Sequence, residues 1–132
     1  MNDVPEGMEG FVYLITNLEN GKKYIGKKTF WERRKDKKTG RRKKKESNWR
    51  DYLSSCDQLK EDIKNTSADK ILKEILHLCP HKKSMSFYET MEQFKRDVIF
   101  RKDYYNTNIE GKFFSNEVEN IYNLVEHAIQ DE

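Results

Sequence analysis

The stretch GFVYLITNLENGKKYIGKK, residues 10–28, predicts two short β-strands joined by a tight turn. Apolar or aromatic side chains occupy both the odd and the even positions of residues 11–15, as expected for a strand whose two faces are both covered. Asn20-Gly21 predicts a type I′ turn, because Asn and Gly adopt positive φ at little cost. Residues 23–26 then return antiparallel to the first strand. The resulting hairpin is the element around which the rest of the chain is organised.

Each arm of this hairpin carries a tyrosine, in Phe11-Val12-Tyr13 on the first arm and Tyr24-Ile25-Gly26 on the second. Two tyrosines across an Asn-Gly turn, followed by basic residues, resemble the signature hairpin of the GIY-YIG nuclease family. The second tripeptide matches the family pattern, whereas the first departs from Gly-Ile-Tyr. The resemblance spans about residues 10–114. It implies an α+β fold with a small three-stranded, mostly antiparallel sheet flanked by helices.

The size of the chain and its composition predict one domain over residues 1–132. We expect residues 1–9 to form a frayed leader and residues 115–132 to form a C-terminal helix capped by Asn116. No apolar run approaches the ~20 residues that span a bilayer, so no membrane partner is expected. The acidic start is unlike a signal peptide, and two separated cysteines are typical of a reducing compartment. These features favour a cytoplasmic protein, in the host cell cytoplasm if the chain is encoded by a phage.

Positive charge is concentrated in one part of the chain. Residues 22–50 contain 15 Lys and Arg against three acidic residues, a net charge of +12, whereas the remainder has a net charge of −9. A block of one sign favours a polyanionic partner, and nucleic-acid phosphate is the obvious one. Residues 35–46 contain no apolar side chain, which predicts a mobile basic insert that becomes ordered on phosphate. The candidate DNA-binding residues are Gly26, Lys27, Lys28, Arg41, Arg42, Lys43, Lys44, Lys45, Trp49 and Arg50.

Three further elements are predicted between the hairpin and Pro80. Thr29 and Glu32 form a capping-box pattern, which predicts a short helix over residues 29–34. Residues 58–65 indicate a second short helix. Residues 70–79 fit helical spacing better than alternation, but the resemblance implies that they form the third strand of the sheet, and we follow the resemblance.

The clearest helix is predicted over residues 86–100, where Ser86 and Glu89 form a capping-box pattern. One stripe of this helix is apolar and is expected to face the core. The stripe consists of Phe87, Met91, Phe94 and Val98. Residues 101–114 are expected to be irregular.

Hydrolysis of a phosphodiester requires an attacking water, a group that accepts its proton, and positive charge on the phosphate in the transition state. The GIY-YIG resemblance implies that the hairpin tyrosines position or deprotonate the water, while an arginine neutralises the phosphate. It also implies that one glutamate holds a divalent metal and that an asparagine braces the site. A single carboxylate suits one Mg²⁺ or Mn²⁺ per site. The residues that match are Tyr13, Tyr24, Arg34, Glu89 and Asn106, with Glu89 as the metal ligand.

Alternatives to these assignments remain open at the level of sequence. The residues that compete with Arg34 for the phosphate charge are Lys27, Lys28, Arg33 and Arg50. Glu92 competes with Glu89 for the metal, although we expect Glu92 to be solvated. Glu89 also fits the role of a helix cap, and Asn106 fits that of an ordinary turn residue.

The sequence therefore predicts a divalent-metal-dependent DNA endonuclease with low or shape-based sequence specificity. A catalytically inactive DNA-binding module with the same fold is a second hypothesis. A third is an interaction protein whose basic loop docks on an acidic partner. Salt-dependent DNA binding separates the third hypothesis from the other two, and cleavage of plasmid DNA with Mg²⁺ separates the first from the second.

Overall fold

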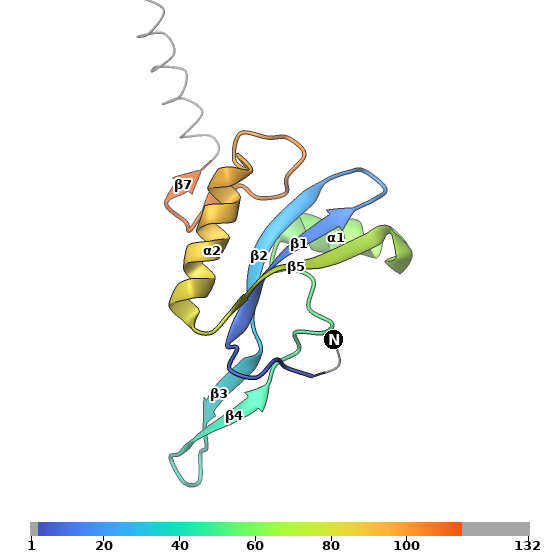
Figure 1. Cartoon of the computed structure of the whole chain (residues 1–132). Helices are drawn as coiled ribbons and strands as arrows, with labels where there is room; N and C mark the ends of the chain where they lie inside the picture. The colour runs from blue at the N-terminus through green and yellow to red at the C-terminus, as the bar shows by residue number, and fades with distance from the viewer. Residues whose placement is uncertain (1–2, 115–132) are drawn as a thin grey trace, which may run out of the picture.

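A computed structural model describes residues 3–114 of the chain, and the predicted C-terminal helix over residues 115–132 lies outside them (Figure 1). The centre is a three-stranded sheet of order β2-β1-β5, in which β1 pairs antiparallel with both neighbours. Its strands are β1 (Gly10–Asn17), β2 (Lys23–Thr29) and β5 (Ile71–Cys79). The fold is therefore α+β with a three-stranded antiparallel sheet, which confirms the expectation from the sequence.

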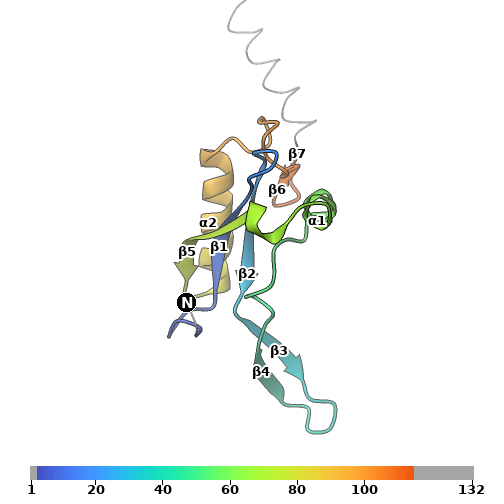
Figure 2. The same ribbon diagram turned by 90° about the vertical axis from the view of Figure 1, so that its right-hand side faces the viewer.

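Two helices cover opposite faces of the sheet (Figure 2). They are α1 (Asp57–Lys64) and α2 (Lys82–Lys95), and a short 3₁₀ helix, η1 (Ala68–Lys70), precedes β5. Side chains of β1 alternate between two hydrophobic clusters: Val12 and Leu14 face α2, whereas Phe11 and Ile15 join the cluster that contains Leu59 of α1. The apolar side chains at successive positions of β1 are thus explained by burial of both faces of the strand.

The turn between β1 and β2 is wider than the type I′ turn predicted from Asn20-Gly21. Gly21 has a φ of +76°, but Asn20 does not adopt a left-handed conformation. The Asn17 N–H donates to the Lys22 carbonyl at 2.8 Å, and the Gly21 N–H donates to the Asn17 carbonyl at 2.7 Å. The amide oxygens of Asn17 and Asn20 also accept bonds from the backbone two residues further on, which stabilises this four-residue loop. The hairpin is confirmed, and its predicted turn type is wrong.

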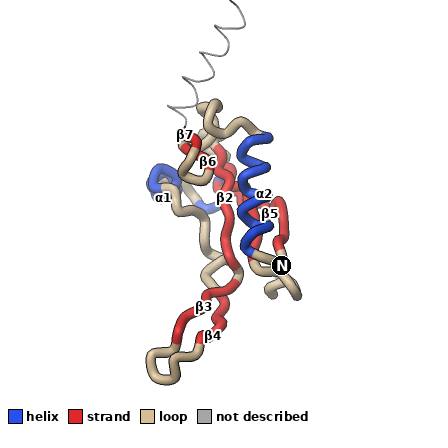
Figure 3. The backbone as a smooth tube through the Cα atoms, turned by 90° about the vertical axis from the view of Figure 1, so that its left-hand side faces the viewer, coloured by secondary structure: helices blue, strands red, loops and turns tan. Residues whose placement is uncertain are grey.

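The basic segment forms a second hairpin. Strand β3 (Trp31–Lys35) pairs antiparallel with β4 (Arg42–Glu46), and the two project from the end of the sheet (Figure 3). The short helix predicted over residues 29–34 is therefore wrong. Residues 35–46, for which mobility is predicted, comprise the end of β3, a turn and β4. Ser47 fixes the base of this hairpin, because its N–H bonds the Phe30 carbonyl at 2.8 Å and its hydroxyl bonds the Thr29 carbonyl at 2.6 Å.

Strand β5 follows the family resemblance rather than its apparent helical spacing. A β-bulge opposite Val12 and Tyr13 inserts an extra residue, because Tyr13 pairs with Ile75 but Val12 pairs with His77. The bulge moves the odd-numbered residues from one face of the sheet to the other. The odd-numbered residues face one side of the sheet before the bulge and the other side after it. The apolar residues of the two segments together therefore resemble helical spacing in the sequence.

Helix α2 begins earlier than predicted and buries a different face. His81 is its N-cap and forms a capping box with Ser84, so the predicted capping role of Glu89 is wrong. The predicted core stripe is also wrong in part, since Phe87 and Phe94 are 62% and 49% exposed. The buried face instead carries Met85 together with two polar residues, Glu92 and Gln93.

Glu92 connects α2 to the edge strand β5. The expectation that Glu92 is solvated is wrong, because its side chain is 6% exposed. His77 Nε2 lies 2.9 Å from one carboxylate oxygen, and Arg96 Nε donates to the other at 2.9 Å. The His77 ring stacks on Tyr88 at a centroid distance of 4.5 Å. Burial raises the pKa of Glu92, but the hydrogen bonds from His77 and Arg96 outweigh this effect and lower it overall.

We predict that Glu92→Gln lowers the free energy of unfolding by about 1–2 kcal/mol at neutral pH, because charge-assisted hydrogen bonds are lost in a buried site. The folded pKa lies below the ordinary value of 4.5, so this stabilisation is present above pH 4.5 and is lost as the pH falls through the folded pKa. Urea titrations across this range should show the difference between wild type and variant shrinking below pH 4.5. The exposed Glu61→Gln serves as control. A difference that stays constant with pH would contradict the assignment.

Candidate active site

A cavity of about 370 Å³ lies beside β2, the outer strand of the sheet, and is lined by residues that are distant in sequence. Tyr24 comes from β2, Glu89 and Gln93 from α2, and Asn106 from the segment after α2. The structure therefore brings together three of the five catalytic candidates, Tyr24, Glu89 and Asn106.

Tyr13 lies behind Tyr24, not in the lining of the cavity. The two rings have a centroid distance of 6.3 Å, and Tyr13 is only 1% exposed. The antiparallel register places Tyr13 opposite Gly26, so its ring crosses the glycine. A methyl group at Gly26 would overlap the Tyr13 hydroxyl and approach Tyr24 Cε1 to 2.9 Å. Gly26 thus allows the two tyrosines to pack side by side.

We predict that Gly26→Ala lowers the free energy of unfolding by about 2 kcal/mol, because the new methyl group overpacks the buried Tyr13 ring and the half-buried Tyr24 ring. Chemical denaturation measures the loss. Thr29→Ala on the same strand is the control and should change stability far less. A Gly26→Ala protein of wild-type stability would mean that the tyrosines do not cross the glycine as described.

Burial raises the pKa of both tyrosines, and the nearby charge of Glu89 raises each of them further. A hydrogen bond with Ser55 offsets part of the increase at Tyr24. Both hydroxyls therefore stay protonated at neutral pH. Each tyrosine can orient a bound group through its hydroxyl, but neither is a ready phenolate base.

Glu89 is a partly desolvated carboxylate at the cavity. Its side chain is 14% exposed, and its Oε1 lies 3.8 Å from Lys27 Nζ. Lys27 Nζ also donates to Ser86 Oγ at 2.9 Å, which places the ammonium group beside the first turns of α2. Burial raises the pKa of Glu89, Lys27 opposes the shift, and Glu110 adds to it. The arrangement favours a cation at the carboxylate, because a cation would offset the lost solvation.

Asn106 fixes the edge of β2 through two hydrogen bonds. The Ile25 N–H donates to Asn106 Oδ1 at 3.0 Å, and Asn106 Nδ2 donates to the Ile25 carbonyl at 2.9 Å. The next residue towards the N-terminus, Tyr105, donates its backbone N–H to the Lys23 carbonyl at 2.7 Å. The side chain of Asn106 thus replaces a neighbouring strand beside Tyr24 and holds it in place.

Gln93 is a cavity residue that the sequence did not identify. It is 5% exposed, and its Nε2 donates to the Ile25 carbonyl at 3.4 Å. Its Oε1 is a buried atom without a hydrogen-bond partner. Because the Ile25 carbonyl is an acceptor, the amide nitrogen must face it and the oxygen must face elsewhere. An unpartnered buried oxygen in the wall of a polar cavity indicates that a donor belongs there. The only signal in the sequence was its place four residues after Glu89, one helical turn away.

The structure does not bring Arg34 to this cavity. Arg34 lies on β3, where its side chain is 82% exposed and lies 3.7 Å from Glu32. The other basic candidates also make contacts elsewhere: Arg33 pairs with Glu9, and Lys28 lies 4.3 Å above the Tyr52 ring. Among the residues that line the described cavity, none is an arginine, and Lys27 Nζ lies 3.8 Å from Glu89 Oε1 in its wall.

Two predicted DNA-binding residues pack against each other beside the core. Trp49 is 4% exposed and packs edge-on against Phe30 at 4.9 Å, so its ring is not available to stack on a base. The guanidinium of Arg50 lies 4.4 Å above the Trp49 ring and pairs with Glu46. Residues 41–45, in contrast, are exposed on the β3–β4 hairpin.

The donor set fits a hydrated hard cation better than a cage of protein ligands. Within residues 3–114, no three His, Cys, Asp or Glu side chains converge as a ligand set. The cavity is lined by the carboxylates of Asp57, Glu89 and Glu110 and by the unpartnered Gln93 oxygen, and Glu110 already accepts a hydrogen bond from Thr90. Mg²⁺ and Mn²⁺ suit such a site, because Mg²⁺ usually keeps several waters and takes one or two carboxylates. A buried amide oxygen can accept a hydrogen bond from such a water.

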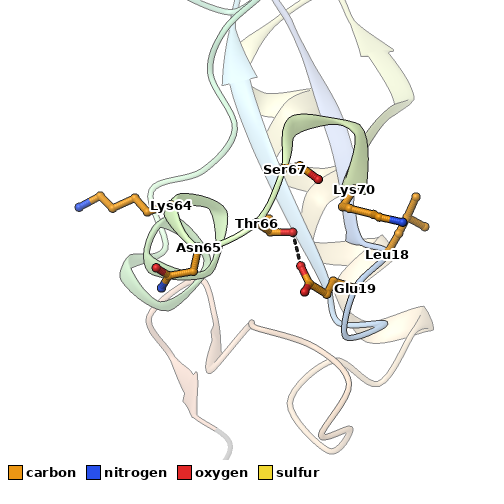
Figure 4. Close-up of a pocket in the computed structure, with 7 residues that line it drawn as sticks. All are labelled: Leu18, Glu19, Lys64, Asn65, Thr66, Ser67 and Lys70. Atoms are coloured by element: carbon orange, nitrogen blue, oxygen red, sulfur yellow. Dashed lines mark hydrogen bonds between the residues drawn. The ribbon is translucent and has the colours of Figure 1, made fainter.

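A second cavity of about 770 Å³ lies between the β1–β2 turn and the end of α1 (Figure 4). Thr66 donates to the Glu19 carboxylate within it. None of the predicted catalytic residues lines this cavity, and its larger volume does not outweigh the chemistry at the β2 edge. No helix in the described part of the chain is long and apolar enough to cross a membrane.

Comparison with known proteins supports the resemblance seen in the hairpin. A family model described as "Putative endonuclease segE, GIY-YIG domain" matches residues 1–109. No curated protein and no solved structure matches the chain. The matched region contains the hairpin, Glu89, Gln93 and Asn106. Together with the three-stranded antiparallel sheet, this match shows that the chain belongs to the GIY-YIG nuclease family.

Proposed function

We propose that the protein is a divalent-metal-dependent DNA endonuclease whose active site is the cavity at the β2 edge. The convergence of Tyr24, Glu89 and Asn106 supports this proposal. These residues come from three segments of the chain and occupy positions that match the family motif. Each was selected from the sequence for one chemical role, so their shared cavity is unlike a chance grouping of surface residues.

In this proposal Glu89 holds one Mg²⁺ or Mn²⁺. When bound there, such an ion would supply positive charge to polarise the scissile phosphate. Gln93 Oε1 accepts a hydrogen bond from a water at the site and so fixes the position of that water.

Tyr24 orients the attacking water through its neutral hydroxyl, because its raised pKa keeps the proton on the ring oxygen. Asn106 acts as a positioning residue, since it holds the β2 backbone next to Tyr24. Lys27 provides a point charge for the phosphate in place of Arg34. Tyr13 supports Tyr24 from behind.

The DNA contacts in this proposal are mainly contacts to phosphate. Lysines and arginines on an exposed hairpin bind the backbone without regard to base identity. We therefore expect low sequence specificity, or specificity that depends on DNA shape.

One observation favours the second candidate, a DNA-binding module without cleavage activity. Arg34, which matches the family arginine by spacing, lies outside the cavity. If Lys27 cannot replace it, the fold binds DNA but stabilises the transition state poorly.

Incubation of supercoiled plasmid with the purified protein and Mg²⁺ or Mn²⁺ distinguishes the two candidates. An endonuclease converts the plasmid to nicked and linear forms, and excess EDTA stops the conversion. The inactive module shifts the plasmid in a gel with either ion but leaves it intact, an outcome that would overturn the proposed function.

A further inference from the structure

The β3–β4 hairpin carries a charge arrangement that is unfavourable in the isolated protein. Its five cross-strand pairs include three that place a cation opposite a cation. These are Arg33↔Lys44, Arg34↔Lys43 and Lys35↔Arg42, three successive pairs towards the tip. Like charges directly opposite each other on neighbouring strands are destabilising. A polyanion bound along the hairpin would turn this repulsion into attraction.

The hairpin is nevertheless held in a defined direction. Its tip closes through two backbone hydrogen bonds, from the Asp36 N–H to the Arg41 carbonyl and from the Gly40 N–H to the Asp36 carbonyl, and Gly40 adopts a φ of +69°. At the base, Arg33 pairs with Glu9, and Lys44 lies 4.2 Å above the Trp31 ring. The cations are thus presented on a fixed two-stranded ribbon, which projects beyond the sheet (Figure 2 and Figure 3).

The two faces of this ribbon differ. Trp31, Arg33 and Lys44 face the body of the protein through the contacts just described. On the other face Arg34 and Lys43 are 82% and 75% exposed. Arg34 lies 3.7 Å from the Glu32 carboxylate, and Lys43 lies 3.2 Å from the Asp36 carboxylate.

A two-stranded ribbon of this kind fits one groove of duplex DNA. The major groove of B-DNA, about 12 Å wide, admits a two-stranded β-ribbon, whereas the minor groove is about 6 Å wide. The major groove of A-form RNA is too deep and narrow for side chains to read. Tyr24 and Arg34 are ten residues apart along β2 and β3, which spans up to ~33 Å at the strand rise. One turn of B-DNA is ~34 Å.

From these observations we propose that the β3–β4 ribbon enters the major groove of duplex DNA about one helical turn from the cavity. This inference rests on the proposed function, because it places the scissile phosphate at the cavity. It adds a requirement for duplex DNA that extends to one side of the cut. It also gives Arg34 a role in substrate binding, at a point on the DNA that is distant from the reacting phosphate.

Binding of fluorescent duplexes in EDTA tests the proposal without cleavage. For wild type, affinity should rise about tenfold as the duplex lengthens from about 8 to about 14 base pairs, because only the longer duplex reaches ribbon and cavity together. Arg34→Ala/Lys43→Ala should remove this rise in affinity with duplex length, the length step. It should also reduce the slope of log K against log salt by about 0.9 per lost phosphate contact. The matched control is Lys60→Ala/Lys64→Ala on α1, which removes the same charge and should keep the step.

Blocking each groove in turn tests which one the ribbon enters. Bulky substituents at C5 of the pyrimidines, which project into the major groove, should weaken wild-type binding about tenfold. They should have little effect on the Arg34→Ala/Lys43→Ala protein. A minor-groove polyamide should leave wild-type binding intact.

The proposal is overturned if the length step is absent, if the control variant loses it equally, or if only the polyamide competes. It is also overturned if an RNA duplex binds as tightly as DNA, or if the protein binds no duplex at all. The proposed function fails separately. If the protein shows every binding result but never cuts plasmid, the proposed role of the ribbon stands and the proposed nuclease function is wrong.

Discussion

Glu89→Gln is expected to lower the rate of DNA cleavage by about 10³-fold while leaving DNA affinity in EDTA unchanged. Glutamine keeps the shape of the side chain and removes only the charge that holds the cation. The carboxylate cannot act merely as a helix cap, because α2 is capped by His81 and Ser84, several residues earlier. Single-turnover cleavage with saturating protein measures the effect on rate without a contribution from binding.

The matched control is Glu110→Gln in the wall of the same cavity. Glu110 accepts a hydrogen bond from Thr90 Oγ1 at 2.6 Å and has no role in the proposed site. It should cut at nearly the wild-type rate. Equal loss in both variants would show that the reaction depends on the overall charge of the cavity rather than on Glu89.

Stability provides a second readout for the same variant. Because the folded pKa of Glu89 is raised above 4.5, its charged form is disfavoured in the folded protein. Without metal, Glu89 therefore contributes a stability loss that develops as the pH rises from 4.5 through the folded pKa. At neutral pH, Glu89→Gln should melt a few degrees above wild type in EDTA. Mn²⁺ should raise the melting temperature of wild type but not that of the variant. A Mn²⁺ shift that persists in Glu89→Gln would place the ion elsewhere.

Tyr24→Phe is expected to lower the cleavage rate by about 10²-fold, with little change in stability or DNA affinity. The substitution removes a hydroxyl that lies in the cavity wall and bonds Ser55, while the ring stays packed against Tyr13. The loss should therefore appear in kcat and not in binding.

Tyr13→Phe is the control for this experiment. Its ring is buried behind Tyr24 and crosses Gly26, outside the lining of the cavity. We expect a smaller loss of rate than in Tyr24→Phe. If Tyr13→Phe were the slower of the two, the Tyr13 hydroxyl would have to reach the reacting phosphate, and the assignment of Tyr24 would be wrong.

The central hairpin could be predicted from the sequence because its signals are local. Alternation along residues 11–15 and the Asn-Gly turn require no knowledge of distant residues. The same local reasoning failed for residues 29–34, where a capping-box pattern predicts a helix. The pairing of β3 with β4 decides that conformation, and three cation–cation pairs are the opposite of what pairing preferences predict.

Helix α2 shows a second limit of local reasoning. Its apolar stripe predicted the buried face, yet Phe87 and Phe94 are exposed, while Glu92 and Gln93 are buried. Those polar residues are buried because distant strands supply partners: His77 on β5 for Glu92 and the Ile25 carbonyl on β2 for Gln93. A sequence pattern alone contains no information about such partners.

The residues of the candidate site also differ in whether their positions could be predicted from the sequence. Tyr24, Glu89 and Asn106 were found through the spacing of a family motif, and the structure collects them in one cavity. Arg34 was assigned from the family resemblance, while residues 29–34 were predicted to form a helix. Since the segment is a strand, each residue advances about 3.3 Å rather than 1.5 Å and carries Arg34 away from the cavity.

The most direct test of the account is a crystal structure of the protein with a duplex longer than one helical turn and Ca²⁺ in place of Mg²⁺. We expect one ion at the Glu89 carboxylate, with a backbone phosphate between that ion, Lys27 Nζ and the Tyr24 hydroxyl. A phosphate bound at the 770 Å³ cavity beside Thr66, or an ion held by Glu92, would contradict it.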